Sequence, residues 1–328
     1  MAVDRSAPIL RTEALTRKYG DHVALDALTL TVHRGEVYGY IGPNGAGKTT
    51  TFRILCGLLD PTAGKAFVAD ADVTGNKDLT KQLVGYLPDN FGVYPTLRVW
   101  EYLDFFAAAY RVPRKQRPER IERCLAIANA GEFRDKLMGA LSRGMKQRVG
   151  IAKTLVHDPQ VLILDEPAAV LDPRARVAMR GLLRDLANLG KAVLVSSHIL
   201  PELADVCDTV GILNGGKLVA SGPVQEILRH VRQTRLVDVH VLGRAAEARA
   251  ALKEAPGEWE PVVAGAGGAG GGNSSNGAGA DGQLRYQVRA DEEQLAAALQ
   301  LLLARGVPVL SFSEVPADLE DVFMSLTK

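Results

Sequence analysis

The chain has 328 residues, and its 39 Lys and Arg residues nearly balance 38 Asp and Glu residues, which gives a formal net charge of +1. Hydrophobic residues make up 47% and charged residues 23%, the balance of a globular protein with a sizeable core, and the length favours about two domains. This composition argues against nucleic-acid binding through bulk charge, and the isolated cysteines Cys56, Cys124 and Cys207 exclude a disulfide framework or a standard zinc site.

Up to about residue 230, short apolar runs typical of buried strands alternate with helical patterns. This alternation predicts an α/β fold in which helices cover a mainly parallel sheet. An interruption at about 90–155, with helical patterns over 97–110 and 117–130, predicts an α-helical insert. The strand-like runs are 36–41, 161–164 and 192–195.

The segment 42–50 follows the first strand-like run, opens a helix and fits the pattern GxxxxGK[ST]. Its glycines permit the backbone to curl around phosphate oxygens, and the positive N-terminus of the next helix faces the same anion. Lys48 is suited to bridge the β- and γ-phosphates, Thr49 to bind Mg²⁺ and Thr50 to reach the α-phosphate. The strand–loop–helix context disfavours the alternative of an ordinary glycine-rich turn. We expect nucleotide binding by Gly42, Pro43, Asn44, Gly45, Ala46, Gly47, Lys48, Thr49 and Thr50.

Two adjacent carboxylates follow the apolar run 161–164. Asp165 is suited to hold Mg²⁺ through water, and Glu166 is suited to act as general base on an attacking water. In isolation, such acids are more often solvated residues at a strand end. Behind a phosphate loop, the catalytic interpretation is favoured.

The segments around these motifs carry a family resemblance. Residues 141–148 read LSRGMKQR, Asp172 follows in LDPRAR, and His198 follows in VSSHIL. In this order, together with the phosphate loop, they resemble the ATP-binding subunit of ABC transporters over about residues 8–230. The resemblance implies a P-loop NTPase cassette (residues 1–230) that hydrolyses ATP with Mg²⁺. It also implies a head-to-tail dimer with two ATP molecules between phosphate loops and signature segments.

The resemblance further implies roles for single residues. Tyr19 would stack on adenine, and a half-buried strand aromatic is the alternative. Ser142 and Gly144 would contact the γ-phosphate held by the opposite subunit, at the positive end of a helix beginning near Ser142. Asp172 would lie at the dimer seam. His198 would hydrogen-bond the γ-phosphate and orient the catalytic carboxylate and water.

Three positions depart from the usual pattern of the family. Asp89 stands where glutamine is usual, and a carboxylate can approach Mg²⁺ but cannot donate as an amide does. In the signature, Arg143 and Met145 replace glycine and glutamine, and Arg143 would either add a cation beside a phosphate or point to solvent. Val170 stands where glycine is common, so this loop should not need a positive φ. The first two departures resemble drug- and polysaccharide-export ATPases, which implies export.

Residues 231–328 show a different order of patterns and predict a small α/β accessory domain. The strand-like runs are 236–241, 284–289 and 307–313, and the helical patterns are 245–254 and 291–304. The glycine-rich segment 265–282 cannot bury enough apolar surface to offset its ordering entropy, which predicts a disordered loop. The segment LEDVF at 319–323 adds to the resemblance to the export subset.

No apolar run approaches the roughly 18 residues of a spanning helix. The resemblance implies a separate membrane-spanning permease as partner, with this chain on the cytoplasmic face as a homodimer or paired with a second ATP-binding subunit. Phe91 and Tyr94 are candidates for contact with that partner. Trp100, Tyr102 and Phe105 more simply fill the core of the insert.

Two other functions compete with this interpretation. A soluble ABC ATPase acting on ribosomes or DNA usually carries tandem cassettes or a long coiled coil, and this chain has one phosphate loop and no sustained heptads. A module that binds ATP without turnover should have lost its base, whereas Glu166 and His198 are both present.

Overall fold

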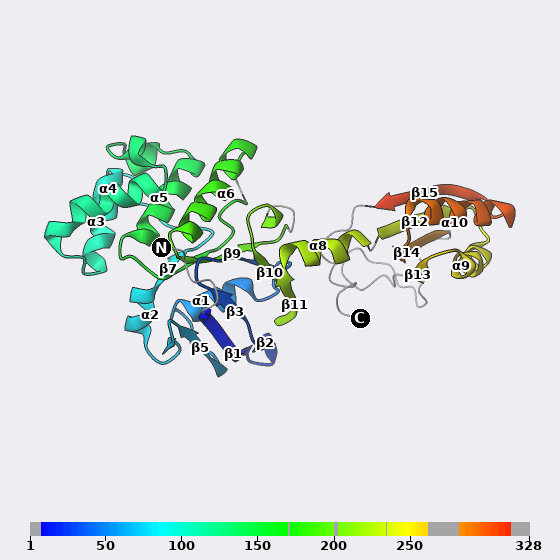
Figure 1. Ribbon diagram of the computed structural model, residues 1–328, viewed down its shortest axis with the longest axis horizontal. Coiled ribbons are helices and arrows are strands. Elements are labelled where there is room, and N and C mark those ends of the chain that lie inside the picture. The colour runs from blue at the N-terminus through cyan, green and yellow to red at the C-terminus, as the bar shows by residue number, and fades with distance from the viewer. Residues whose placement is uncertain (1–7, 170, 200–202, 234, 262–281, 316–328) are drawn as a thin grey trace. The chain divides into compact units, whose positions relative to one another are not determined.

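The chain divides into two compact units, Met1–Val224 and Gln225–Lys328, in the computed structural model drawn in Figure 1. The structure describes residues 8–169, 171–199, 203–233, 235–261 and 282–315. Three sequence-based expectations fall outside these ranges: the backbone at Val170, the glycine-rich segment except Gly282, and the LEDVF segment.

A six-stranded sheet forms the centre of the first unit, in the order β11-β10-β4-β9-β8-β7. Neighbouring strands from β10 to β7 pair in parallel, and β11 pairs antiparallel with β10. Every residue of β4, β8 and β9 is buried, as expected of parallel strands covered on both faces. This confirms the α/β class. The strands are β4 (Val37–Ile41), β7 (Val84–Leu87), β8 (Val161–Leu164), β9 (Ala192–Ser197), β10 (Thr209–Asn214) and β11 (Lys217–Pro223).

A second, antiparallel sheet of the first unit was not anticipated from the sequence. It has the order β2-β1-β5-β6, with β3 also paired to β1. Register shifts interrupt the pairing of β1 with β2, β3 and β5, so a strict two-residue alternation does not run along β1. The strands are β1 (Pro8–Tyr19), β2 (His22–Leu28), β3 (Thr31–His33), β5 (Ala63–Val68) and β6 (Ala71–Asp72).

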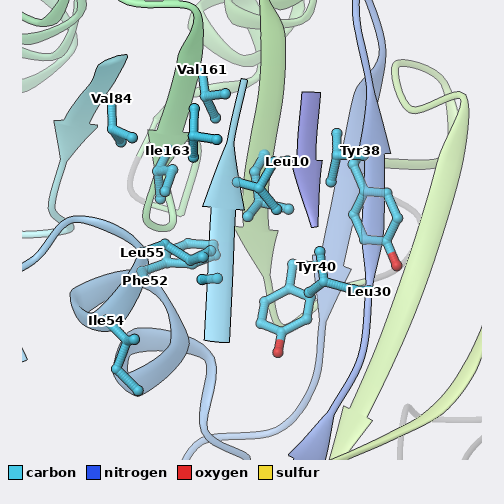
Figure 2. Close-up of a cluster of buried hydrophobic side chains, with 14 of the residues drawn as sticks. Leu10, Leu30, Tyr38, Tyr40, Phe52, Ile54, Leu55, Val84, Val161 and Ile163 are labelled. Carbon is cyan, nitrogen blue, oxygen red and sulfur yellow. The ribbon is translucent and has the colours of Figure 1, made fainter. Parts of the chain in front are cut away.

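One apolar core joins the two sheets through helix α1 (Lys48–Leu55). Figure 2 shows Phe52 and Leu55 of α1 among side chains of the strands. The ring of Phe52 stacks on Tyr40 of β4 with centroids 5.6 Å apart, and the hydroxyl of Tyr40 lies 3.0 Å from that of Thr51. This packing fixes the first turn of α1 against the end of β4, where the phosphate loop begins.

The helical insert is present as expected and consists of α3 (Val99–Ala109), α4 (Arg117–Ile127) and α5 (Arg143–Leu155), which pack on one another. Tyr102 is fully buried, which agrees with the expectation that it fills the core of the insert. The side chain of Phe105 is half exposed, so the same expectation was wrong for Phe105. Helix α5 also contacts β7, and α6 (Pro173–Asn188) contacts β9 and β4. Helix α2 (Lys77–Leu83) leads into β7.

The second unit has a four-stranded antiparallel sheet in the order β13-β14-β12-β15. Its core includes Val239 of β12, Leu252 of α9 and Leu302 of α10. Strand β13 was not expected, because its four residues include two Glu and a Pro. None of the described helices has the length and apolar character that crossing a membrane requires. The elements are α8 (Val224–Gln233), β12 (Arg235–Val241), α9 (Ala245–Glu254), β13 (Glu258–Pro261), β14 (Gln283–Arg289), α10 (Glu292–Ala304) and β15 (Val309–Val315).

Candidate active site

The phosphate loop connects the end of β4 to the start of α1. Gly47 has φ +108°, and a Cβ there would lie 2.7 Å from the carbonyl oxygen of Ala24, so only glycine fits. Gly47 is also the N-cap of α1, and no side chain caps this helix end. The first-turn amides of α1 are therefore left for an anion.

Lys48 is buried at the first position of α1. Its ammonium group donates to the carbonyl of Gly42 and, over 3.3 Å, to that of Pro43. It also lies 3.6 Å from Oε1 of Glu166. Burial lowers the pKa of Lys48, and the negative charges of Glu166 and Asp165 oppose that shift. The positive charge of Lys48 is thus held between the loop and the acidic strand end.

Asp165 is a buried carboxylate with hydrogen bonds on both oxygens. Thr49 donates its hydroxyl to Oδ2 at 3.0 Å, and Ser196 donates to Oδ1 at 2.7 Å. Burial, followed by the charge of Asp165, raises the pKa of Tyr86, which keeps this phenol neutral beside the carboxylate. The motif residues Thr49 and Asp165 are therefore in direct contact.

Glu166 lies between the phosphate loop and His198. Its Oε2 is 2.7 Å from Nδ1 of His198, and its Oε1 faces Lys48. The backbone of Glu166 has φ +49°, a left-handed conformation that is costly for a residue other than glycine and is concentrated at functional sites. The backbone N–H of Glu166 donates to the hydroxyl of Ser196 at 2.9 Å.

Ser196 was missed by the sequence interpretation, although it belongs to the same segment as His198. Its hydroxyl accepts from Glu166 and donates to Asp165, so one side chain holds both acids. The signal was available in the two serines that end β9, because small hydroxyl side chains at the carboxyl end of a buried strand face the site edge of the sheet.

The structure does not bring all candidate residues together. Ser142 caps α5 by accepting from the amide of Met145 at 3.4 Å. Gly144 lies in the first turn of that helix, where an added Cβ would approach only Leu171 and Ala175. These signature residues have local contacts, and Arg143 beside them is exposed.

Within the described residues, three further candidates form no hydrogen bond or ion pair with the cluster formed by Lys48, Thr49, Asp165, Glu166, Ser196 and His198. They are Asp172, Tyr19 and Asp89. Asp172 caps α6 by accepting from the amide of Ala175 at 2.9 Å. Tyr19 is 44% exposed at the end of β1, with the guanidinium of Arg17 4.6 Å above its ring. Asp89 follows β7 with an exposed side chain. Tyr19 is thus a partly exposed aromatic at a strand end, which fits both the adenine-stacking interpretation and the alternative of a half-buried strand aromatic.

Comparison with known proteins now defines the class. Residues 25–169 match the family model described as ABC transporter. The "Nod factor export ATP-binding protein I" of Ralstonia nicotianae is 32% identical over 323 residues, which cover 98% of this chain and 94% of that protein. The chain belongs to the ABC transporter ATP-binding proteins. It is an ATPase of that family, as the sequence predicted.

Solved structures agree with this membership. The chain is similar to cbiO1 from Clostridium perfringens, part of the ABC transporter complex cbiONQ, with 30% identity and a TM-score of 0.63 over 69% of this chain and 93% of that one. It is also similar to the dimeric bacterial ABC transporter cassette MJ0796, with 25% identity and a TM-score of 0.60 over 66% of this chain and 99% of that one.

Proposed function

We propose that this ATPase works as a head-to-tail dimer that powers export through a separate membrane-spanning subunit. The observation that supports hydrolysis most directly is the position of Glu166, whose two carboxylate oxygens face Lys48 and His198. A carboxylate held between a phosphate-binding lysine and a histidine is placed to accept a proton from a water that attacks the terminal phosphate of ATP. The likeness to a dimeric cassette supports the dimer.

ATP would bind with its phosphates in the loop 42–50. The loop amides and the N-terminus of α1 would meet the phosphate charge, and Lys48 would release the carbonyls of Gly42 and Pro43 to reach the β- and γ-phosphates. Thr50 would bond the α-phosphate. Tyr19, at the end of β1, would stack on adenine through a ring that now lies against the guanidinium of Arg17.

Mg²⁺ would be held by Thr49 and Asp165 together with phosphate oxygens and water. Their oxygens lie 3.0 Å apart, and hydroxyl and carboxylate oxygens are the ligands this ion prefers. Among the described residues, no group of three or more His, Cys, Asp and Glu side chains is placed to hold a metal. A nucleotide that supplies further oxygens fits such a two-residue site. Bound Mg²⁺ would neutralise charge that develops on the phosphates.

Glu166 would accept a proton from the attacking water, and His198 would fix the orientation of Glu166 while donating to the γ-phosphate. The 2.7 Å contact between Nδ1 of His198 and Oε2 of Glu166 supports this pairing. Lys48, now bonded to phosphate, would leave Oε1 of Glu166 open to the water. Asp89, beyond the end of β7, would approach Mg²⁺ only through water.

The opposite subunit would complete the site. Ser142 and Gly144 lie at the N-terminus of α5, whose first-turn amides and positive end suit a γ-phosphate from a second chain. Asp172 at the start of α6 would lie at the seam between the chains. The likeness to the "Nod factor export ATP-binding protein I" supports export rather than import.

The membrane partner would contact the insert. Tyr94 is half exposed and packs edge-on against the half-exposed ring of Phe105, with centroids 5.5 Å apart. Phe91 instead packs toward Gly150 of α5. Tyr94 and Phe105 are therefore the better candidates for a surface that binds the permease. This partner would place the chain on the cytoplasmic face of the membrane, as a homodimer or paired with a second ATP-binding subunit.

The test is substitution of Glu166 by Gln in the full chain. We expect Glu166→Gln to abolish ATP hydrolysis, to retain ATP binding and to accumulate an ATP-bound dimer by size-exclusion chromatography. The exposed insert residue Glu132 supplies the control, since Glu132→Gln should behave as the unaltered chain. Undiminished turnover by Glu166→Gln would contradict the role of the base.

A further inference from the structure

A pocket of about 290 Å³ lies at the amino ends of the parallel strands, whereas the phosphate loop lies at their carboxyl ends. Arg34 precedes β4, Gln160 precedes β8 and Lys191 precedes β9, and all three line this pocket. The phosphate loop and Asp165 follow the carboxyl ends of the same strands. The pocket therefore belongs to a different part of the first unit from the nucleotide site.

The other wall of the pocket comes from the helical insert. Helix α4 contributes Arg120, Arg123 and the buried Cys124. The pocket thus joins two parts of the first unit, the insert and the amino ends of the central strands.

The charges around the pocket do not balance. Four cations line it (Arg34, Arg120, Arg123 and Lys191), but Asp158 is the one carboxylate of the lining. Burial raises the pKa of the Cys124 thiol to about 11, so this group adds no negative charge near neutral pH. With all four cations protonated, the pocket has an excess of three positive charges.

The internal contacts satisfy only part of this charge. Lys191 lies 2.8 Å from Asp158 and donates to the carbonyl of Pro159 at 2.6 Å. Arg120 reaches the second oxygen of Asp158 at 3.9 Å. Burial opposes ionisation of Asp158, but Lys191 and the two α4 arginines lower its pKa overall, so its single charge is already shared.

The remaining two cations, Arg34 and Arg123, form no ion pair with a carboxylate among the described residues. Arg34 donates to the neutral amide oxygen of Gln160 at 3.1 Å. Arg123 is exposed on α4 and forms no ion pair within the described ranges. Guanidinium groups bind phosphate oxygens in pairs of parallel hydrogen bonds. Two such groups that face one pocket and form no ion pair are suited to bind phosphate oxygens.

We propose that this pocket binds a small soluble anion with two or more phosphate charges, separately from the nucleotide site. A volume of about 290 Å³ is at the small end of ligand sites, which span roughly 300–1,000 Å³. It therefore suits a pyrophosphate-sized group rather than a polymer. The bound anion would link Arg120 and Arg123 of the insert to Arg34 and Lys191 at the strand ends, and so restrain the insert against the sheet.

The experiment is calorimetric titration of inorganic pyrophosphate into the full chain, which needs no hydrolysis and does not depend on the proposed function. The background is Lys48→Ala, which weakens binding at the phosphate loop. We expect one pyrophosphate to bind per chain, and Arg120→Gln with Arg123→Gln to weaken that binding at least tenfold. Arg114→Gln is the matched control, because Arg114 is an exposed arginine of the insert outside the pocket.

Two results would overturn the proposal. One is pyrophosphate binding that is unaffected by Arg120→Gln with Arg123→Gln. The other is an equal loss in Arg114→Gln, which would show a non-specific effect of surface charge. If the Lys48→Ala chain fails to fold, the same variants are compared with Lys48 intact. There the double substitution should lower the pyrophosphate stoichiometry by one per chain, and an unchanged stoichiometry would refute the pocket.

Discussion

At the scale of single residues, one hydroxyl controls the geometry of both acids. Ser196 donates to Asp165 at 2.7 Å and accepts from the backbone of Glu166 at 2.9 Å. In the proposed mechanism Asp165 holds the cation and Glu166 accepts the proton, so Ser196 acts on both groups through its hydrogen bonds to them. It is a positioning residue.

We expect Ser196→Ala to lower kcat for ATP hydrolysis by about tenfold or more. The substitution removes one hydrogen bond to a charged group, worth roughly 1.5–3 kcal/mol, and leaves the N–H of Glu166 without its partner. Steady-state phosphate release measures the effect. Ser221→Ala is a matched control, because Ser221 bonds Tyr38 at 2.8 Å, away from the acids. Equal turnover in both variants would show that Ser196 does not position the site.

The sequence identified the residues of this site that stand in linear motifs. Lys48, Thr49, Asp165 and Glu166 were all found, and the structure brings them into contact. Ser196 was not found, because its role arises from the pairing of β8 with β9. Leu164 pairs with Val195, so the next residues, Asp165 and Ser196, become neighbours only when the sheet forms.

At the scale of elements, strands were predictable where their pattern does not depend on which strands they pair with. The run 161–164 coincides with β8, because a strand covered on both faces is apolar at every position. Strand β1 was missed because its exposed positions include Glu13 and Lys18, and its bulged pairing breaks the alternation. The burial pattern of β1 depends on its pairing with several strands, so it cannot be predicted from the sequence of β1 alone.

A histidine that follows α5 adds to the contacts between the insert and the central sheet. The ring of His157 stacks on Tyr110, at the end of α3, with centroids 3.9 Å apart, and its Nε2 lies 3.2 Å from the carbonyl oxygen of Val84 in β7. Burial lowers the pKa of His157 to about 4, and Lys191 and Lys153 add to the shift. The folded chain therefore holds this imidazole neutral.

We expect this histidine to make folding sensitive to acid. The unfolded chain has an ordinary histidine pKa of about 6.5, so between that pH and about pH 4 only the unfolded state binds the proton. Stability is then fully present above pH 6.5 and falls as the pH drops to 4, by up to about 3 kcal/mol. Urea unfolding at several pH values measures the slope.

The matched variants are His157→Phe, which keeps the stacking but cannot titrate, and His22→Gln on the exposed start of β2. The first should flatten the dependence of the free energy of unfolding on pH between 6.5 and 4, although its stability at neutral pH falls through loss of the bond to Val84. The second should leave the slope as it is. A slope unchanged in His157→Phe would mean that other groups cause the acid sensitivity.

At the scale of the whole molecule, the described residues include two apolar cores that share no residue, one in each unit. One is built on both sheets of the first unit and α1, and the other on the four-stranded sheet with α9 and α10. All residues that this chain would contribute to the nucleotide site belong to the first unit. Ligand binding stabilises only the part that binds it, by about 2.7 kcal/mol when the ligand is at a hundredfold excess over Kd.

The two tryptophans of the chain report on the two units separately. Trp100 is partly buried in α3 of the insert, and Trp259 packs against Tyr286 in the second core, with ring centroids 5.8 Å apart. We expect saturating ADP with Mg²⁺ to raise the thermal midpoint of Trp100 fluorescence, measured in Trp259→Phe. The midpoint of Trp259 fluorescence, measured in Trp100→Phe, should not move.

The two variants distinguish independent unfolding of the units from cooperative unfolding of the whole chain. Each variant keeps both units in one chain and changes only which tryptophan reports. If the two units unfold independently, only the Trp100 midpoint should shift, because ligand binding does not stabilise a unit that lacks the binding site. Equal shifts in both midpoints would mean that the units unfold as one cooperative body. The second unit would then sense the nucleotide state of the first.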